Sequence, residues 1–262
     1  MVVEPAPEAD KLNILPPGTV LITGASGGLG KKLVDAFVQA GATRVIAASR
    51  RAVSWNHPQV VPIELDVTND AQVLDAATRH AHELDILINN AGYNHNTKFL
   101  DVDADNARSE MEVNYFGTLR VIRAFAPAMR KRRSGTIINI MSVGSHISFP
   151  NMGSYCASKS ALHILTQSVR AELSFFGIDV IGIYPPAVDT PMSAHVPATN
   201  KIPAELVASH VLDALRDGID DVYVGPAAEL YERIRREPKV IETMLRSRVA
   251  PFDQIPDPCN KR

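Results

Sequence analysis

A tyrosine and a lysine with helical spacing form a pair that is suited to proton transfer. Tyr155 and Lys159 are four residues apart, so on a helix their side chains share one face. An ammonium close to a phenol favours the phenolate and lowers its pKa from about 10 toward neutral pH, which suits a tyrosine for general acid–base chemistry. The same pair on a solvated helix face would do no chemistry, so its place in the fold has to decide.

A glycine-rich turn forms a second candidate site, for an anion. The run from Val20 to Thr23 is uncharged and β-prone, and apolar residues recur with helical spacing from Leu29 to Val38. The turn between these segments holds four glycines, Gly24, Gly27, Gly28 and Gly30. Such a turn lets the backbone approach a phosphate and aims the free N–H groups of a helix at it, as in dinucleotide sites. Because the spacing is not the common G-x-G-x-x-G, a plain tight turn is the alternative.

Polar and glycine residues also follow the other expected strands. In an open parallel sheet, ligands bind at the carboxyl ends of the strands, so these residues are expected to line one crevice for cofactor and substrate. They are Thr23-Gly24, Ser49-Arg50, Asp66, Asn90-Ala91-Gly92, Ser142 and Tyr184-Pro185.

The elements that must position these residues alternate between strand and helix. Pro127 is expected to bend the longest helix near its end, and the prolines that follow Tyr184 exclude regular structure throughout residues 184–203. We expect strands at residues 20–23, 44–51, 60–67, 85–92, 136–140, 179–183 and 222–224. We expect helices at 29–38, 69–82, 104–132, 153–176 and 204–216, with a further helical stretch up to Pro238.

This alternation predicts an α/β fold: a single doubly wound Rossmann domain with a mainly parallel, seven-stranded sheet and helices on both faces. The first unit, residues 20–49, is a βαβ crossover, which is right-handed in a parallel sheet. We place the domain at residues 17–236, after a flexible lead-in at 1–16 and before a C-terminal tail at 237–262. No second domain and no internal repeat is expected.

Composition narrows the class of protein. Of the 262 residues, 45% are hydrophobic and 21% charged, an ordinary globular balance. The net charge of −2 favours neither nucleic acid nor an anionic membrane as a partner. Cys156 and Cys259 have no metal-ligand spacing, so no metal is expected. The first sixteen residues have no apolar core and do not resemble a signal peptide, and no run approaches the roughly 18 apolar residues of a membrane span. We expect a cytoplasmic protein.

Five ordered motifs resemble the short-chain dehydrogenases/reductases. They are Thr23-Gly24-x-x-x-Gly28-x-Gly30, Asn89-Asn90-Ala91-Gly92, Asn114, Ser142 and Tyr155-x-x-x-Lys159. The resemblance covers roughly residues 19–192, and Ser142 precedes Tyr155 by 13 residues, as in that family. It implies hydride transfer between a nicotinamide cofactor and a carbonyl or alcohol.

The resemblance also implies roles for four catalytic residues. Tyr155 would protonate the carbonyl oxygen during reduction, and Ser142 would hydrogen-bond to the substrate oxygen. Lys159 would hold the nicotinamide ribose and lower the pKa of Tyr155. Asn114 would hold a water that relays protons to Lys159. As alternatives, Ser142 could be a strand cap and Asn114 a polar residue of a helix interior.

The resemblance places the cofactor along the predicted crevice. Asp66 would meet the adenine amino group, the Asn90–Gly92 turn would pass beneath the adenosine ribose, and Val188 and Thr190 could contact the carboxamide. The expected cofactor-binding residues are Gly24, Ser26, Gly28, Leu29, Gly30, Ser49, Arg50, Asp66, Val67, Asn90, Ala91, Gly92, Tyr155, Lys159, Val188 and Thr190.

The residues after the second strand favour NADP(H) over NAD(H). A carboxylate there would hydrogen-bond to the ribose hydroxyls of NAD and repel a 2′-phosphate. This chain has Ser49, Arg50 and Arg51 instead, and a hydroxyl with a guanidinium suits a phosphate. We expect Arg50 to bind the phosphate and Arg51 to be solvated.

The sequence indicates less about the residues that would contact the substrate. The family usually has Pro-Gly after the sixth strand, whereas this chain has Pro185-Pro186, which stiffens the backbone beside the nicotinamide. Four apolar residues in nearby loops suggest a partly apolar pocket, or belong to the core: Phe149, Met152, Met192 and Val196. His95, His146 and His195 are expected at the surface or in the pocket wall, Cys156 is expected to be packed, and the proline-rich segment after Tyr184 could close over substrate.

The sequence therefore predicts an NADPH-dependent reductase of ketones or aldehydes. The alternatives are NADP-dependent oxidation of a secondary alcohol and a non-catalytic NADP(H)-sensing regulator, against which the intact Ser142, Tyr155 and Lys159 argue. The expected partner is a small carbonyl or alcohol substrate, with no nucleic acid and no membrane. By analogy with the family, the helices at 104–132 and 153–176 would form a homodimer or homotetramer.

Overall fold

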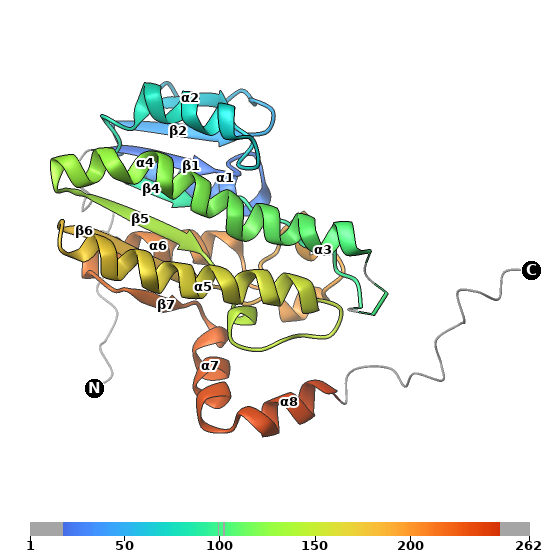
Figure 1. Ribbon diagram of the computed structural model, residues 1–262. Helices are drawn as coiled ribbons and strands as arrows, with labels where there is room; N and C mark the ends of the chain where they lie inside the picture. The colour runs from blue at the N-terminus through green and yellow to red at the C-terminus, as the bar shows by residue number, and fades with distance from the viewer. Residues whose placement is uncertain (1–17, 99, 102, 247–262) are drawn as a thin grey trace, which may run out of the picture.

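A single sheet of parallel strands organises the chain (Figure 1). The computed structural model describes residues 18–98, 100–101 and 103–246. Its strands are β1 (Thr19–Thr23), β2 (Arg44–Ser49), β3 (Val60–Glu64), β4 (Ile86–Asn89), β5 (Gly135–Ile140), β6 (Ile178–Tyr184) and β7 (Asp221–Tyr223). They lie in the order β3-β2-β1-β4-β5-β6-β7, and every neighbouring pair is parallel. The predicted fold class is confirmed.

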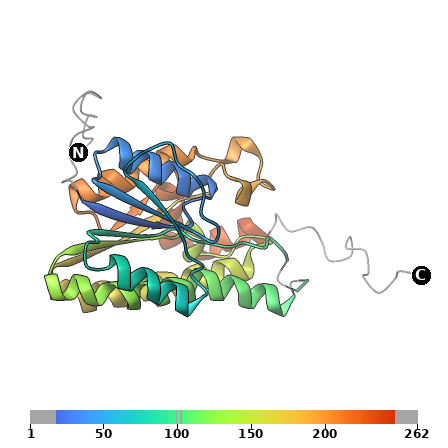
Figure 2. The ribbon, with the colours of Figure 1, turned by 90° about the horizontal axis from the view of Figure 1, so that it is seen from above.

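Helices cover both faces of the sheet, as Figure 2 shows. One face is covered by α1 (Gly28–Gln39) and α6 (Ala204–Asp217), and the other by α2 (Asp70–His80), α4 (Thr118–Arg132) and α5 (Gly153–Ser174). The central strands are mostly apolar and buried because successive side chains enter opposite layers. In β1, Val20 and Ile22 pack with α1 and α6, whereas Leu21 packs with the helices of the other face.

The long predicted helix at residues 104–132 is divided by a π-helical turn. It consists of α3 (Ala104–Met111), the π turn η2 (Glu112–Gly117) and α4. Pro127 lies inside α4 and does not end it. The helix ends where Arg133 takes a left-handed conformation, with φ of 57°. The π turn matters for the site because it carries Asn114.

The prediction that a C-terminal tail begins at residue 237 is wrong for residues 238–246, which form a helix. After α7 (Pro226–Arg236), the chain forms α8 (Pro238–Arg246). Ile241 and Leu245 are buried because their i, i+4 spacing turns both toward an apolar cluster that includes Val143 and Leu230. The expectations for residues 1–16 and for the last sixteen residues lie outside the described residues.

The segment between β6 and α6 is mostly irregular, as its prolines predict. It contains two short 3₁₀ turns, η4 (Pro191–Ser193) and η5 (Ala198–Asn200). A third, η3 (Val143–Ser145), follows β5. Among the helices of the described residues, none is both long enough and apolar enough to cross a membrane.

Candidate active site

A cavity of about 1570 Å³ lies at the carboxyl ends of the strands. The switch point of the sheet is here, because β1 has β2 on one side and β4 on the other. All sixteen residues predicted to bind the cofactor line this cavity, and so does Ser142. Asn114 is not in the cavity wall. Among these sixteen residues, the topology brings together positions up to 166 apart in the sequence, Gly24 and Thr190 being the most distant.

The glycine turn is built for close approach. Gly24 has φ of +65°, and a Cβ there would lie 2.8 Å from the Cα of Ala91. A Cβ on Gly30 would lie 2.2 Å from the carbonyl oxygen of Gly24. The first helical bond of α1 runs from the N–H of Lys31 to Gly27, so the preceding N–H groups of its first turn have no partner in the helix. This end of the cavity fits a pyrophosphate.

The segment after β6 crosses directly over the glycine turn. A Cβ on Gly28 would lie 2.8 Å from the Cβ and Cγ2 atoms of Thr190. The hydroxyl groups of Thr190 and Ser193 both donate to the carbonyl oxygen of Val188, which ties this crossing into a turn. Val188 and Thr190 therefore border the cavity opposite the start of α1.

At the β2 end of the cavity, the free charge is positive. Ser49 is the last residue of β2 and donates from Oγ to the carbonyl oxygen of Arg51 (2.8 Å). Arg50 is exposed, lines the cavity and has no ion-pair partner among the described residues. Arg51 does not line the cavity. The carboxylate of Asp66 accepts from the N–H and the hydroxyl of Thr68, and among the described residues no ion pair joins it to Arg50.

The proton-transfer pair lies on the first turns of α5, facing the end of β5. Tyr155 is 8% exposed and Lys159 is 4% exposed. The Lys159 ammonium donates to the carbonyl oxygen of Ile140 (2.8 Å) and lies 5.9 Å from the centroid of the Tyr155 ring. Ser142 hydrogen-bonds to the side chain of Tyr155. Tyrosine, lysine and serine thus meet at one wall of the cavity.

Burial, more than the lysine, sets the acidity of this pair. It raises the pKa of Tyr155 above its usual value, and the hydrogen bond from Ser142 only partly offsets the rise. Burial also lowers the pKa of Lys159 to about 8. Desolvation of the phenolate is the largest cause of the shift for Tyr155, and the lowering of the Tyr155 pKa by Lys159 stays a prediction. Tyr155 is consequently a phenol, and a proton donor, at neutral pH.

Asn114 lies behind the cavity wall. Its Oδ1 accepts from the N–H of Tyr93 (2.8 Å), and its Nδ2 donates to the carbonyl oxygen of Tyr93 and to the hydroxyl of Ser158. A Cβ on Gly92 would lie 3.4 Å from Asn114 Oδ1 and 3.8 Å from Lys159 Nζ. Asn114 and Lys159 thus both lie beside Gly92, and Asn114 fixes the segment that follows the Asn90–Gly92 turn; its role in a water relay to Lys159 stays a prediction.

The far end of the cavity is largely apolar. The four predicted pocket residues, Phe149, Met152, Met192 and Val196, all line it, as do Pro186 and His195. Leu230 of α7 also lines it and was missed, because nothing in the sequence places that helix near the site. Tyr93, Asn94 and Asn96 form a more polar wall. The ring of His95 instead hydrogen-bonds to Asn106 and Tyr93.

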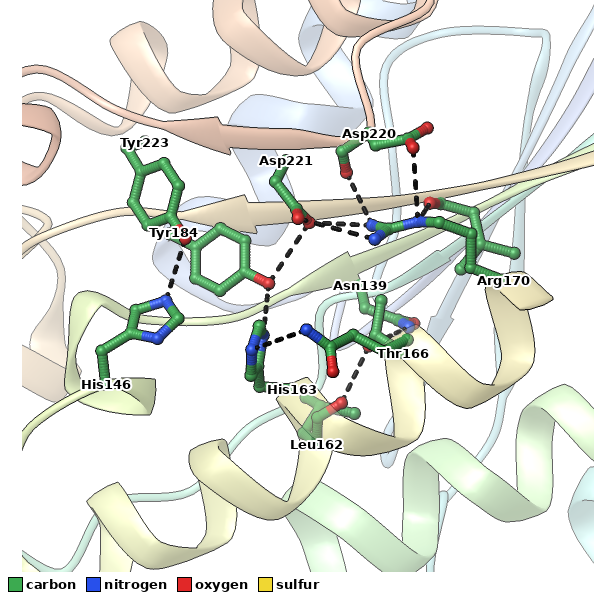
Figure 3. Close-up of polar contacts among 12 residues, drawn as sticks. Asn139, His146, Leu162, His163, Thr166, Arg170, Tyr184, Asp220, Asp221 and Tyr223 are labelled. Atoms are coloured by element: carbon green, nitrogen blue, oxygen red, sulfur yellow. Dashed lines mark hydrogen bonds and ion pairs between the residues drawn. The ribbon is translucent and has the colours of Figure 1, made fainter. Parts of the chain in front are cut away.

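A cluster of aromatic and histidine rings packs against the loop after β5, which carries Ser142 and His146 (Figure 3). His146, four residues after Ser142, lies 4.7 Å from the ring of His163 and 5.2 Å from that of Tyr184. Its Nε2 is 3.0 Å from the Tyr223 hydroxyl. The Tyr184 hydroxyl is 2.7 Å from His163 and 3.3 Å from Asp221. These contacts join the loop after β5 to α5, β6 and β7.

Members of one protein family resemble this chain in sequence and in structure. The family described as short chain dehydrogenase matches residues 18–201. A short-chain dehydrogenase of Penicillium ochrochloron is 39% identical over 181 residues, which span 66% of either chain. An uncharacterized oxidoreductase of Staphylococcus epidermidis is 34% identical over 221 residues, 79% of this chain and 96% of that protein. The crystal structure of a short chain dehydrogenase from Burkholderia cenocepacia in complex with NADP is 39% identical, with a TM-score of 0.84, and the match covers 90% of this chain and 98% of that one.

Proposed function

The chain belongs to the short chain dehydrogenase family, and from this premise we propose that it reduces a ketone or aldehyde to an alcohol with NADPH. The observation that carries the proposal is the meeting of Ser142, Tyr155 and Lys159 at one wall of a cavity whose other end has Arg50, which forms no ion pair with any described residue. The first group suits proton transfer to a carbonyl, and the arginine suits a 2′-phosphate.

Each side chain has a chemical role in this proposal. The nicotinamide, when bound, supplies the hydride. Ser142 donates a hydrogen bond to the substrate oxygen, which orients the carbonyl beside Tyr155. The Tyr155 hydroxyl then gives its proton to that oxygen as negative charge develops on it. The positive charge of Lys159 favours the resulting phenolate, and in this proposal the ammonium also holds the nicotinamide ribose. Oxidation of the alcohol is the same chemistry in reverse.

The preference for NADPH rests on the residues after β2. Arg50 lines the cavity without an ion-pair partner among the described residues, so its guanidinium is free to bind a phosphate. The Burkholderia cenocepacia relative was crystallised with NADP, which supports the same choice. The N–H groups at the start of α1 would bind the pyrophosphate, and Asp66 the adenine amino group.

We also propose that the enzyme is a homodimer or homotetramer. Ile164 of α5 is 59% exposed, and Phe175, just after this helix, is 76% exposed. Apolar side chains on one outer helical surface are typical of an interface between subunits.

The test is a panel of chemically varied ketones and aldehydes, followed by the loss of NADPH absorbance, with NADH as the control cofactor. We expect turnover of at least one apolar carbonyl compound and a clear preference for NADPH. No turnover across the panel, in either direction, would favour a sensor of NADP(H) instead. Equal kcat/KM with NADH would contradict the cofactor assignment.

A further inference from the structure

A buried glutamate lies next to the catalytic wall. Glu110 is 1% exposed and is the one buried residue of α3. Its Oε1 accepts a hydrogen bond from the backbone N–H of His95 (2.7 Å), whereas its Oε2 is buried and has no hydrogen-bond partner among the described residues. A buried polar atom without a partner is uncommon and costs free energy. This cost points to a role for Glu110 beyond the stability of its helix.

Glu110 and Asn114 hold the same segment of chain. They are one helical turn apart, and both reach the residues that follow the Asn90–Gly92 turn. Asn114 binds the N–H and the carbonyl oxygen of Tyr93, and Glu110 binds the N–H of His95. Since Tyr93, Asn94 and Asn96 line the cavity, the two side chains together fix one of its walls.

The same glutamate lies level with Tyr155. Helices α3 and α5 pack against each other and run in the same direction (Figure 1). Asn114 hydrogen-bonds to Ser158 of α5, so Glu110, one turn earlier, lies at the level of Tyr155 and Cys156. Burial is the main cause of the raised pKa of Tyr155 and of the Cys156 thiol, and the negative charge of Glu110 raises the pKa of both further.

The other groups that face Tyr155 act differently. Ser142, from the loop after β5, stabilises the phenolate by its hydrogen bond, and the Cys156 thiol of α5 opposes it. Lys159 supplies positive charge at 5.9 Å from the ring centroid. Glu110 contributes the carboxylate of this set, from a different helix, and the hydrogen bonds of the His95 ring are made to Asn106 and Tyr93.

We propose that Glu110 is a positioning residue of the active site: it fixes the Tyr93–His95 segment through one carboxylate oxygen, and it places a buried carboxylate of α3 level with Tyr155 of α5. Glu110 does not line the cavity, so it acts through these neighbours and not on the substrate or the cofactor. The inference rests on the proposed function, because its effect on turnover requires Tyr155 to exchange the proton.

The first test separates charge from shape. Glu110→Gln keeps an oxygen that can accept from the His95 N–H and removes the charge, whereas Glu110→Asp keeps the charge. Oxidation of the alcohol with NADP⁺ requires ionised Tyr155, so its pH profile reports the change. For Glu110→Gln, we expect the pH of half-maximal kcat to fall by about 0.5 to 1 unit, with the KM for the alcohol within about twofold of wild type. Glu110→Asp should keep the wild-type midpoint. An unchanged or higher midpoint in the glutamine variant would overturn the proposal.

The second test addresses the fixed segment without measuring turnover. Glu110→Leu removes the acceptor as well as the charge, so the backbone N–H groups of residues 93–96 should exchange with deuterium faster than in the wild type. Glu110→Gln should retain slow exchange there. Equal exchange in the wild type and the leucine variant would refute the positioning role.

A matched control is Glu172→Gln, the same change at an exposed position of α5. It should leave the pH profile and the exchange at residues 93–96 unchanged, and a midpoint shift equal to that of Glu110→Gln would overturn the proposal. If the wild-type protein turns over neither carbonyl compounds nor alcohols, the proposed function has failed, and deuterium exchange still decides whether Glu110 fixes the segment.

Discussion

The chemistry of individual residues in this site depends on how deeply they are buried. Tyr155 and Lys159 are both nearly inaccessible, which raises the pKa of the phenol and lowers that of the ammonium to about 8. Each shift favours the neutral form. At neutral pH the phenol keeps its proton and most of the lysine remains charged, which is the state that a carbonyl reductase needs before hydride transfer.

Arg50 offers a direct test of the cofactor assignment at the scale of one residue. A charge-assisted hydrogen bond to phosphate contributes about 1.5 to 3 kcal/mol, so Arg50→Ala should raise the KM for NADPH by about 10- to 150-fold. The KM for NADH should change little, because NADH lacks the 2′-phosphate. Steady-state kinetics with both cofactors measures this difference.

Arg51→Ala is the matched control, since Arg51 follows Arg50 and does not line the cavity. It should keep the wild-type preference. A loss of preference in the Arg51 variant, or an equal rise of both KM values in the Arg50 variant, would contradict the assignment.

Some residues of the site could be predicted from the sequence and others could not. The glycines, Ser49, Asp66 and Asn90 could be placed because each follows an apolar strand. Glu110 could not, since an acidic residue in a polar helix is typical of a solvent-exposed face. The raised pKa of Tyr155 was also missed, because the spacing of Tyr155 and Lys159 indicates a shared face but gives no information on burial.

At the scale of elements, the α7–α8 pair links the C-terminal part of the domain to the apolar end of the cavity. Ile241 of α8 is fully buried in a cluster with Val143, next to Ser142, and with Leu230, which lines the cavity. This helix was missed in the sequence because Pro238 is the kind of residue that ends helices. A proline is favourable in the first turn, where its missing N–H is not needed, and α8 begins at Pro238.

Removing the side chain of Ile241 should therefore affect both stability and substrate binding. We expect Ile241→Ala to lower the free energy of unfolding by about 2 to 4 kcal/mol, because it leaves a cavity in a packed cluster. The KM for the carbonyl substrate should rise, and that for NADPH should not. Denaturant unfolding and steady-state kinetics test this.

The neighbouring Val240 is 55% exposed, so Val240→Ala serves as the control and should change neither quantity. If the two variants were equally stable, α8 would not be part of the folded core.

At the scale of the whole molecule, the ring cluster around His146 joins the loop that carries Ser142 to the C-terminal part of the domain. It connects the loop after Ser142 to α5, β6 and β7, and through the stacked rings of Tyr223 and Tyr231 to α7 (3.9 Å between centroids). Burial is the main cause that lowers the pKa of His146 to about 4, and the neighbouring His163 lowers it further, against the opposing effect of Asp221.

This lowered pKa predicts sensitivity to acid. In the unfolded chain His146 has the ordinary pKa of 6.5, so below that pH the unfolded state binds more protons than the folded state. The stabilising contribution of the neutral ring is complete above about pH 6.5 and is lost as the pH falls toward 4. His146→Phe keeps an aromatic ring and cannot titrate, so its melting temperature should fall less steeply between pH 7 and 4.5 than that of the wild type.

His57→Phe, at an exposed position, should follow the wild-type curve. Parallel curves for the wild type and the His146 variant would show that this ring does not contribute to acid sensitivity.

The central claim is that NADPH gives its hydride to a carbonyl carbon while Tyr155 gives a proton to the oxygen. The most direct measurement is the mass of the alcohol formed from NADPH deuterated at the transferring position of its nicotinamide, with the wild type and with Tyr155→Phe. We expect one deuterium at the carbinol carbon for the wild type, and almost no product for the variant although it still binds NADPH. Unlabelled alcohol from the wild type, or undiminished labelled product from Tyr155→Phe, would contradict it.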